Sequence, residues 1–207
     1  MTYIRIVAVT GSVLVLAACD PVEGFDGISA GSVPDSELVT LNMDGTLPDQ
    51  NFSGIGVSGS GESFAGSGST LSGYSFAYGR VTGTNTFLGV AGFAPTSVPG
   101  AEVDTGTVGY TGTYQLAYIG NTEQTQSGDI TLTATFTGRT FTGEADGLIV
   151  NGTYGGAGGT ELGGEVSFGG VTATLDGVVG QDRVVGAFAG NTTGAVLVGG
   201  ILAEADE

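Results

Sequence analysis

The chain has 207 residues, 41 of them glycine, and its 21 acidic and four basic residues give a formal net charge of −17. It contains no histidine, lysine or tryptophan, which excludes Schiff-base lysines, histidine-dependent nucleophiles and histidine-ligated zinc. Neutralising phosphate needs clustered lysine and arginine, so no nucleic acid partner is expected. The hydrophobic content of 40% indicates a folded chain rather than a disordered one.

Residues 1–18 have the pattern of a bacterial export signal. Arg5 precedes an apolar run from Ile6 to Ala18, which is shorter than the about 20 residues that a membrane span needs. The junction Leu16-Ala17-Ala18-Cys19 resembles the lipobox of bacterial lipoproteins, in which the cysteine becomes lipid-modified. It predicts lipid attachment at Cys19, with an ordinary secretory signal as the alternative. A lipid anchor makes the membrane a partner and places the chain in the cell envelope, as an outer membrane lipoprotein facing the surface or the periplasm.

The mature chain begins with segments that carry little periodic signal. Residues 19–50 hold three prolines among small and acidic residues, which indicates a tether or arm, with Glu37 to Met43 as a possible first strand. Residues 51–95 are rich in glycine and serine, so they form either a flexible linker or the strands of a small sheet. Within them, Gly73 to Val81 and Thr86 to Phe93 have the pattern of a hairpin.

Residues 107–203 carry the clearest pattern, because short alternating runs are separated in most cases by two to six residues. In Gly128–Phe136 apolar side chains alternate strictly with threonine and aspartate, and no helical stripe competes. Such short connections force antiparallel neighbours. The pattern predicts an all-β protein: a C-terminal eight-stranded antiparallel up-and-down barrel, preceded by a small Gly/Ser-rich β region. The expected strands are Thr107–Ile119, Gly128–Phe136, Thr140–Ala145, Gly147–Tyr154, Glu161–Phe168, Val171–Val179, Arg183–Ala189 and Ala195–Ala203.

An integral outer-membrane barrel is the architectural alternative, since alternation alone does not say which face meets lipid. The lipobox favours the tethered barrel, because a barrel embedded in lipid rarely needs an acyl anchor. The chain also ends in Ala203-Glu204-Ala205-Asp206-Glu207, without a terminal aromatic residue.

The last two strands resemble the closing hairpin of the transferrin-binding-protein-B-like barrel family. The similar residues are Val185 to Gly190 and Gly199-Gly200-Ile201-Leu202, and Tyr110 to Tyr114 matches an early barrel strand. Ala189 and Asn191 replace a tyrosine and a proline of the family pattern. The resemblance implies a surface or periplasmic lipoprotein of a Gram-negative bacterium that binds a ligand. It does not imply transferrin, since family members with that ligand are larger, two-lobed proteins.

Few residues are candidates for chemistry. Glu144 and Asp146 could share one strand face as a glycosidase pair does, but a solvated face beside a turn is favoured. Tyr110, Tyr114 and Tyr118 project from one side of a strand, so they could line a barrel mouth or form an aromatic contact stripe, but packing in the core or across strands is favoured. The acids are scattered singly, so no metal site is expected beyond weak calcium binding. No catalytic residue and no cofactor are expected.

The sequence therefore predicts a non-catalytic lipoprotein that binds a protein or small solute, with its ligand-binding residues unassigned. The alternative is a structural envelope lipoprotein with a filled barrel and no dedicated ligand.

Overall fold

The computed structural model describes residues 35–48, 59–67, 70–80, 87–94, 97, 106–120, 122–155 and 160–206. All regular elements in this part of the chain are strands, and none of its segments is a helix long and apolar enough to cross a membrane. The signal segment and Cys19 lie outside the described residues. The division of the chain into signal, arm, β region and barrel therefore stays a prediction.

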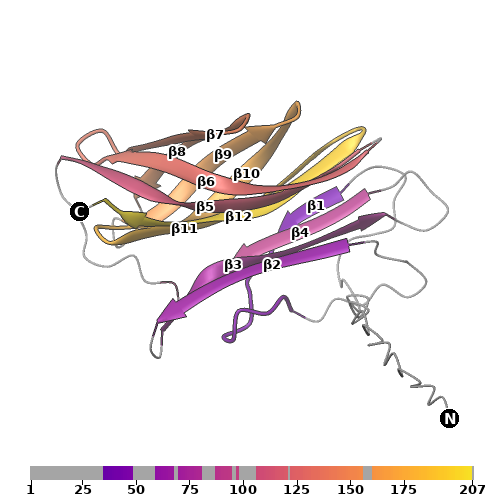
Figure 1. Cartoon of the computed structure of the whole chain (residues 1–207), viewed down its shortest axis with the longest axis horizontal. Coiled ribbons are helices and arrows are strands. Elements are labelled where there is room, and N and C mark those ends of the chain that lie inside the picture. The colour runs from indigo at the N-terminus through magenta and orange to yellow at the C-terminus, as the bar shows by residue number, and fades with distance from the viewer. Residues whose placement is uncertain are drawn as a thin grey trace, which may run out of the picture.

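Eight consecutive antiparallel strands close into a barrel (Figure 1), which confirms the predicted fold class. Each strand pairs with its neighbour in sequence, and β12 closes the barrel on β5. The strands are β5 (Thr107–Ile119), β6 (Glu123–Thr135), β7 (Thr140–Ala145), β8 (Leu148–Gly155), β9 (Glu161–Phe168), β10 (Val171–Val179), β11 (Arg183–Thr192) and β12 (Ala195–Ala205).

A separate four-stranded sheet precedes the barrel in the order β1-β4-β3-β2. Its strands are β1 (Asp35–Leu38), β2 (Gly59–Ser67), β3 (Thr70–Arg80) and β4 (Phe87–Phe93). The described residues of the Gly/Ser-rich region thus form strands of a small sheet, where a flexible linker was the alternative. β1 begins earlier and is shorter than the strand expected from Glu37 to Met43, and it pairs in parallel with β4.

The barrel wall has two unequal halves. β5 and β6 have 13 residues each, and β11 and β12 have 10 and 11. By contrast β7, β8, β9 and β10 have only 6 to 9. We call the first four strands the long half and the other four the short half. In the short half, two-residue turns at Asp146–Gly147 and Gly169–Gly170 have the positive φ angles that type I′ hairpins require.

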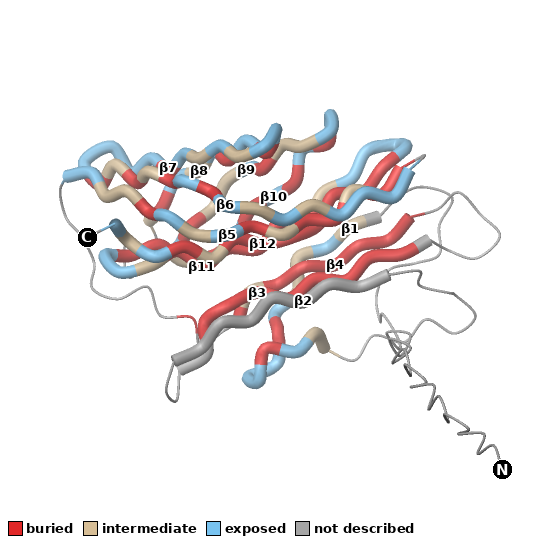
Figure 2. The backbone as a smooth tube through the Cα atoms, in the orientation of Figure 1, coloured by how far each residue is buried: buried red, intermediate tan, exposed pale blue. Residues whose placement is uncertain are grey.

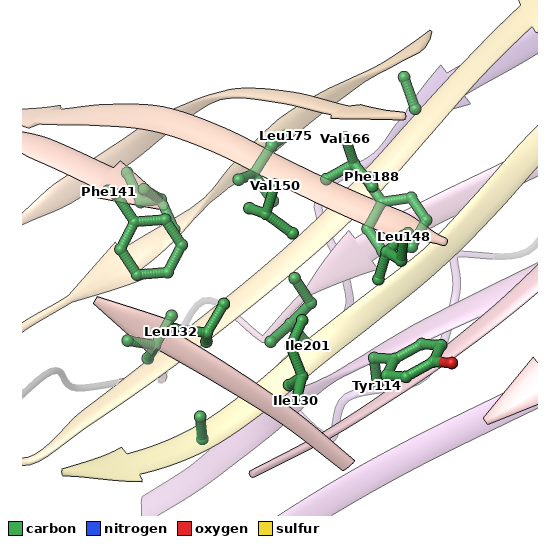
Figure 3. Close-up of a cluster of buried hydrophobic side chains, with 14 of the residues drawn as sticks. Tyr114, Ile130, Leu132, Phe141, Leu148, Val150, Val166, Leu175, Phe188 and Ile201 are labelled. Atoms are coloured by element: carbon green, nitrogen blue, oxygen red, sulfur yellow. The ribbon is translucent and has the colours of Figure 1, made fainter. Parts of the chain in front are cut away.

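Side chains fill the interior of the barrel. Figure 3 shows Phe141, Phe188, Leu132 and Ile201 pointing towards one another from different strands. These four side chains are at most 1% exposed. Eight strands leave an interior just wide enough for side chains, and here the described residues occupy it.

The small sheet packs against the outer faces of three strands of the long half, β5, β11 and β12. The rings of Tyr74, Phe76 and Tyr78 on β3 pack with outward-facing residues of β5, β11 and β12, including Val196 and Val198. Gly200 of β12 lies directly beneath Tyr74, and a Cβ atom there would meet its ring. β11 and β12 are consequently buried over most of their length, as the tube in Figure 2 shows.

Elsewhere the described outer face of the barrel is mostly polar, although Ile149 of β8 is exposed there. The outward residues of β6 and β10 include Asp129, Thr131, Thr172 and Thr174, all of them exposed. An integral outer-membrane barrel needs outward apolar side chains at such positions. The outer faces of these two strands therefore disagree with that alternative.

Four of the expected barrel strands, Thr107–Ile119, Thr140–Ala145, Glu161–Phe168 and Val171–Val179, have the observed bounds. The largest difference is in β6, which begins at Glu123 where the alternation predicted Gly128. Gln124 to Ser127 carry polar side chains on both faces of the strand, so no alternation marks them. β11 and β12 also extend a few residues beyond the expected ends.

Candidate functional site

The tyrosine row of β5 faces the barrel interior. Tyr110 and Tyr114 are fully buried in the core, and Tyr118 is partly buried against it. Tyr110 donates a hydrogen bond to the carbonyl oxygen of Gly180 at 2.9 Å, and burial raises its pKa to about 12. The row thus packs in the barrel core, as the favoured interpretation had it, and does not form an aromatic contact stripe.

Glu144 and Asp146 do not form a carboxylate pair on one face. Glu144 is exposed on the outer face of β7, opposite Thr131. Asp146 occupies the first position of the β7–β8 turn, with φ 45°, and its carboxylate turns towards the hydroxyl of Tyr114 at 3.5 Å. This geometry supports the favoured interpretation, in which the two residues lie beside a turn.

A polar network closes the barrel end that carries the β5–β6 and β7–β8 turns. The Gln126 side-chain amide donates to the Tyr114 hydroxyl at 2.7 Å and to the Asp146 carbonyl oxygen at 3.3 Å. Burial is the main cause that raises the pKa of Tyr114, the Gln126 hydrogen bond opposes it, and the Asp146 carboxylate adds to it. Tyr118 and Phe168 lie at the same end in an edge-to-face contact, with their ring centroids 6.1 Å apart.

An open hollow of about 290 Å³ lies between the small sheet and the barrel wall. β3 contributes aromatic rings to its lining, whereas β5 and β6 contribute mostly polar residues. The lining residues are Phe76, Tyr78, Gln115, Leu116, Thr125, Gln126 and Ser127. Aromatic surface beside a few polar groups is the usual composition of a ligand site. We take this hollow as the candidate functional site.

Glu123, the first residue of β6, reaches from the barrel to the small sheet. Its carboxylate accepts a hydrogen bond from the Tyr78 hydroxyl. The pKa of Tyr78 is raised, first by burial and then by the charge and the hydrogen bond of Glu123. This contact joins β3 to the hairpin of β5 and β6 next to the hollow.

The sequence did not single out any residue of the hollow. Gln115, Thr125 and Ser127 are ordinary polar residues on the outer face, and only the docking of β3 makes them neighbours of Phe76. A useful signal would have been the aromatic alternation Tyr74, Phe76 and Tyr78, which marks one face of a strand. Within the described residues, no group of three or more acidic or cysteine side chains is arranged to hold a metal ion.

Comparisons with known proteins place two solved structures beside this chain. Intact Ap-TbpB, with its N and C lobes, aligns at 9% identity and a TM-score of 0.48, over 73% of this chain and 39% of its own. A surface lipoprotein aligns at 13% identity and a TM-score of 0.46, over 70% of this chain and 81% of its own. The chain thus spans about two fifths of the length of intact Ap-TbpB.

No protein-family model matches the sequence, and no curated protein sequence matches it.

Proposed function

We propose that this chain is an exported bacterial lipoprotein, anchored through Cys19, whose barrel and small sheet bind a protein or small solute in the cell envelope without catalysis. The hollow between β3 and the β5–β6 hairpin is the observation that carries the binding role. Because side chains fill the barrel interior, the ligand binds outside the barrel. The lipid anchor rests on the lipobox alone.

Anchoring and location are tested together. Mass spectrometry of the mature N-terminus should find a lipid-modified Cys19, and Cys19→Ser should release the chain from the membrane fraction. Protease treatment of intact cells then separates a surface location, where the chain is cleaved, from a periplasmic one. An unmodified cysteine would contradict the anchor.

The binding role is tested by filling the hollow. Ser127→Trp places a large ring into it, whereas Thr172→Trp places the same ring on the exposed outer face of β10. We expect the wild-type chain and Thr172→Trp to retain the same ligand on purification from native cells, detected by native mass spectrometry, and Ser127→Trp to lose it. A ligand absent from all three chains would favour the structural envelope role, which the filled barrel also fits. A ligand retained equally by all three would contradict binding in the hollow.

A further inference from the structure

We propose that the outer edge of β6, from Glu123 to Ser127, binds an extended basic segment of another polypeptide by accepting it as an additional strand. This inference rests on the proposed binding function and names the class of partner. It follows from the direction of the backbone groups of β6, the length of β7, and the charges around the edge.

The hydrogen bonds at the two ends of the β5–β6 ladder fix which backbone groups of β6 face β5. The register is constant from Thr107↔Thr135 to Ile119↔Glu123. Just beyond its ends, Phe136 N–H donates to Gly106 O at 2.8 Å, and Gly120 N–H donates to Thr122 O at 3.0 Å. Bonded and non-bonded pairs alternate in an antiparallel ladder. The even-numbered residues of β6 therefore bond to β5, and the odd-numbered residues point their N–H and C=O groups away from it.

β7 is too short to cover the whole of this outer edge. It pairs with β6 only from Thr131 to Thr135, because the chain turns back at Asp146–Gly147. In the described part of the chain, no strand pairs with the outward N–H and C=O groups of Glu123, Thr125 and Ser127. All three residues are exposed.

The edge also lacks several of the features that normally prevent pairing with another chain. Proteins protect exposed edges with charged side chains, proline, bulges or a covering segment. The stretch from Glu123 to Ser127 contains no proline, its pairing with β5 has no bulge, and Glu123 is its one charged residue, which a basic partner would neutralise. An added strand here would continue the line of β7 along β6, which is the geometry of β-strand addition.

The charges around the edge select a basic partner. Glu123 lies at its start, and Asp129, Glu144 and Asp146 lie where β7 begins to cover β6, all of them exposed. Arg139 lies at the opposite end of the barrel, in the β6–β7 turn. Four carboxylates around one short edge favour a segment that carries lysine or arginine.

The edge and the hollow form one continuous site. Side chains of paired residues point to the same face of a sheet, so partner residues opposite Thr125 and Ser127 point to the outer face. Thr125 and Ser127 themselves line the hollow. Backbone pairing would supply affinity, and the partner side chains directed to the hollow would supply specificity.

The test selects binders for the full chain from a library of random seven-residue peptides and measures amide hydrogen exchange with and without the selected peptide. We expect peptides enriched in lysine and arginine, and binding that weakens with salt. Slowed exchange should appear at the N–H groups of Glu123, Thr125 and Ser127, whereas those of Gln124 and Gln126 should not change.

Two pairs of variants separate backbone pairing from side-chain contact. Thr125→Pro and Ser127→Pro remove one outward N–H each, at positions where proline is tolerated because β5 does not use that N–H. Each should weaken peptide binding about tenfold. Thr125→Val and Ser127→Ala keep the N–H and should weaken binding less. If a proline variant does not fold, the amide exchange pattern of the wild-type chain with bound peptide distinguishes backbone pairing from side-chain contact.

Four results would overturn the inference. Three of them concern peptides: that none is selected, that bound peptides slow exchange elsewhere, or that they bind the proline variants equally well. The fourth is a concentration-dependent dimer that slows exchange at the same three amides without peptide, since the occupant would then be a second copy of the chain. Loss of the hollow's ligand in Ser127→Trp is a separate readout, so the proposed function can stand when this inference fails.

Discussion

The short half of the barrel and the strands of the long half that the small sheet covers, β5, β11 and β12, bury their residues differently, although all are antiparallel strands. In β10, apolar residues alternate with exposed threonine and aspartate, because only its inner face is covered. In β12, the run from Ala195 to Ile201 is buried on both faces, because the small sheet covers the outer one. In this chain, strict alternation thus marks a strand whose outer face is exposed to solvent, and a continuous apolar run marks a strand whose outer face is covered.

The strongest test of this comparison places the same charge on the outer face of a covered strand and on the outer face of an exposed strand. Val196→Asp puts a carboxylate on the covered outer face of β12, where Val196 is fully buried. We expect it to lower the free energy of unfolding by about 3–5 kcal/mol, the typical cost of an uncompensated buried charge. Thr172→Asp puts the charge on the bare face of β10 and should change it by less than about 0.5 kcal/mol. Urea denaturation measures both, and similar losses would contradict the comparison.

A smaller effect is expected at the contact between sheet and barrel. Gly200→Ala drives a methyl group into the ring of Tyr74, so the sheet must shift away from β12. Overpacking of this kind costs about 1–3 kcal/mol. Gly163→Ala in β9 is the matched control, because a Cβ atom there meets no other atom within 4 Å. If Gly200→Ala and Gly163→Ala had the same denaturation midpoint, Tyr74 would not pack on Gly200.

Alkaline pH probes the interior of the long half. Burial raises the pKa of Tyr110 to about 12, above the usual value near 10. Between these values the unfolded chain loses the phenolic proton and the folded chain keeps it, so stability falls as pH rises, by up to about 1.4 kcal/mol per pH unit. Tyr110→Phe loses the hydrogen bond to Gly180 but should show a shallower fall in this range. If the free energy of unfolding of Tyr110→Phe fell with pH as steeply as that of the wild-type chain, the Tyr110 hydroxyl would have to be exposed to water.

The smallest expected effect concerns the contact beside the hollow. Glu123→Gln removes the charge that helps to raise the pKa of Tyr78, so this pKa should fall but stay above its usual value, because burial is the larger cause. The difference in tyrosinate absorbance between Glu123→Gln and Glu123→Gln with Tyr78→Phe isolates this group. No change from the wild-type titration would mean that β6 and β3 are not in contact there.

Much of the barrel could be predicted from the sequence, because its strands obey simple rules. Period-two alternation located β10, and glycine-rich turns separated the strands. The packing of Tyr110 and Tyr114 in the core was one of the two interpretations of their spacing, and the structure confirms it. The outward polar faces followed from the same alternation.

The candidate site could not be predicted, because it arises from two long-range arrangements. The hollow exists only where β3 lies against β5 and β6, and nothing in the local sequence around Gln115 specifies that docking. The start of β6 was missed because Gln126 points inward to the hydroxyl of Tyr114, where the pattern expects an apolar residue. A polar residue satisfied inside a barrel is indistinguishable from a loop residue when only the sequence is read.

The most direct test of this account is residue-resolved amide hydrogen exchange of the protein without any ligand. Because β6 extends beyond the end of β7, we expect the rate of amide exchange to alternate from residue to residue at the start of β6. Fast exchange is expected at Glu123, Thr125 and Ser127, and slow exchange at Gln124 and Gln126, whose N–H groups bond to β5. Uniformly slow exchange across these five residues would contradict the account, because it would mean that another strand already covers the edge.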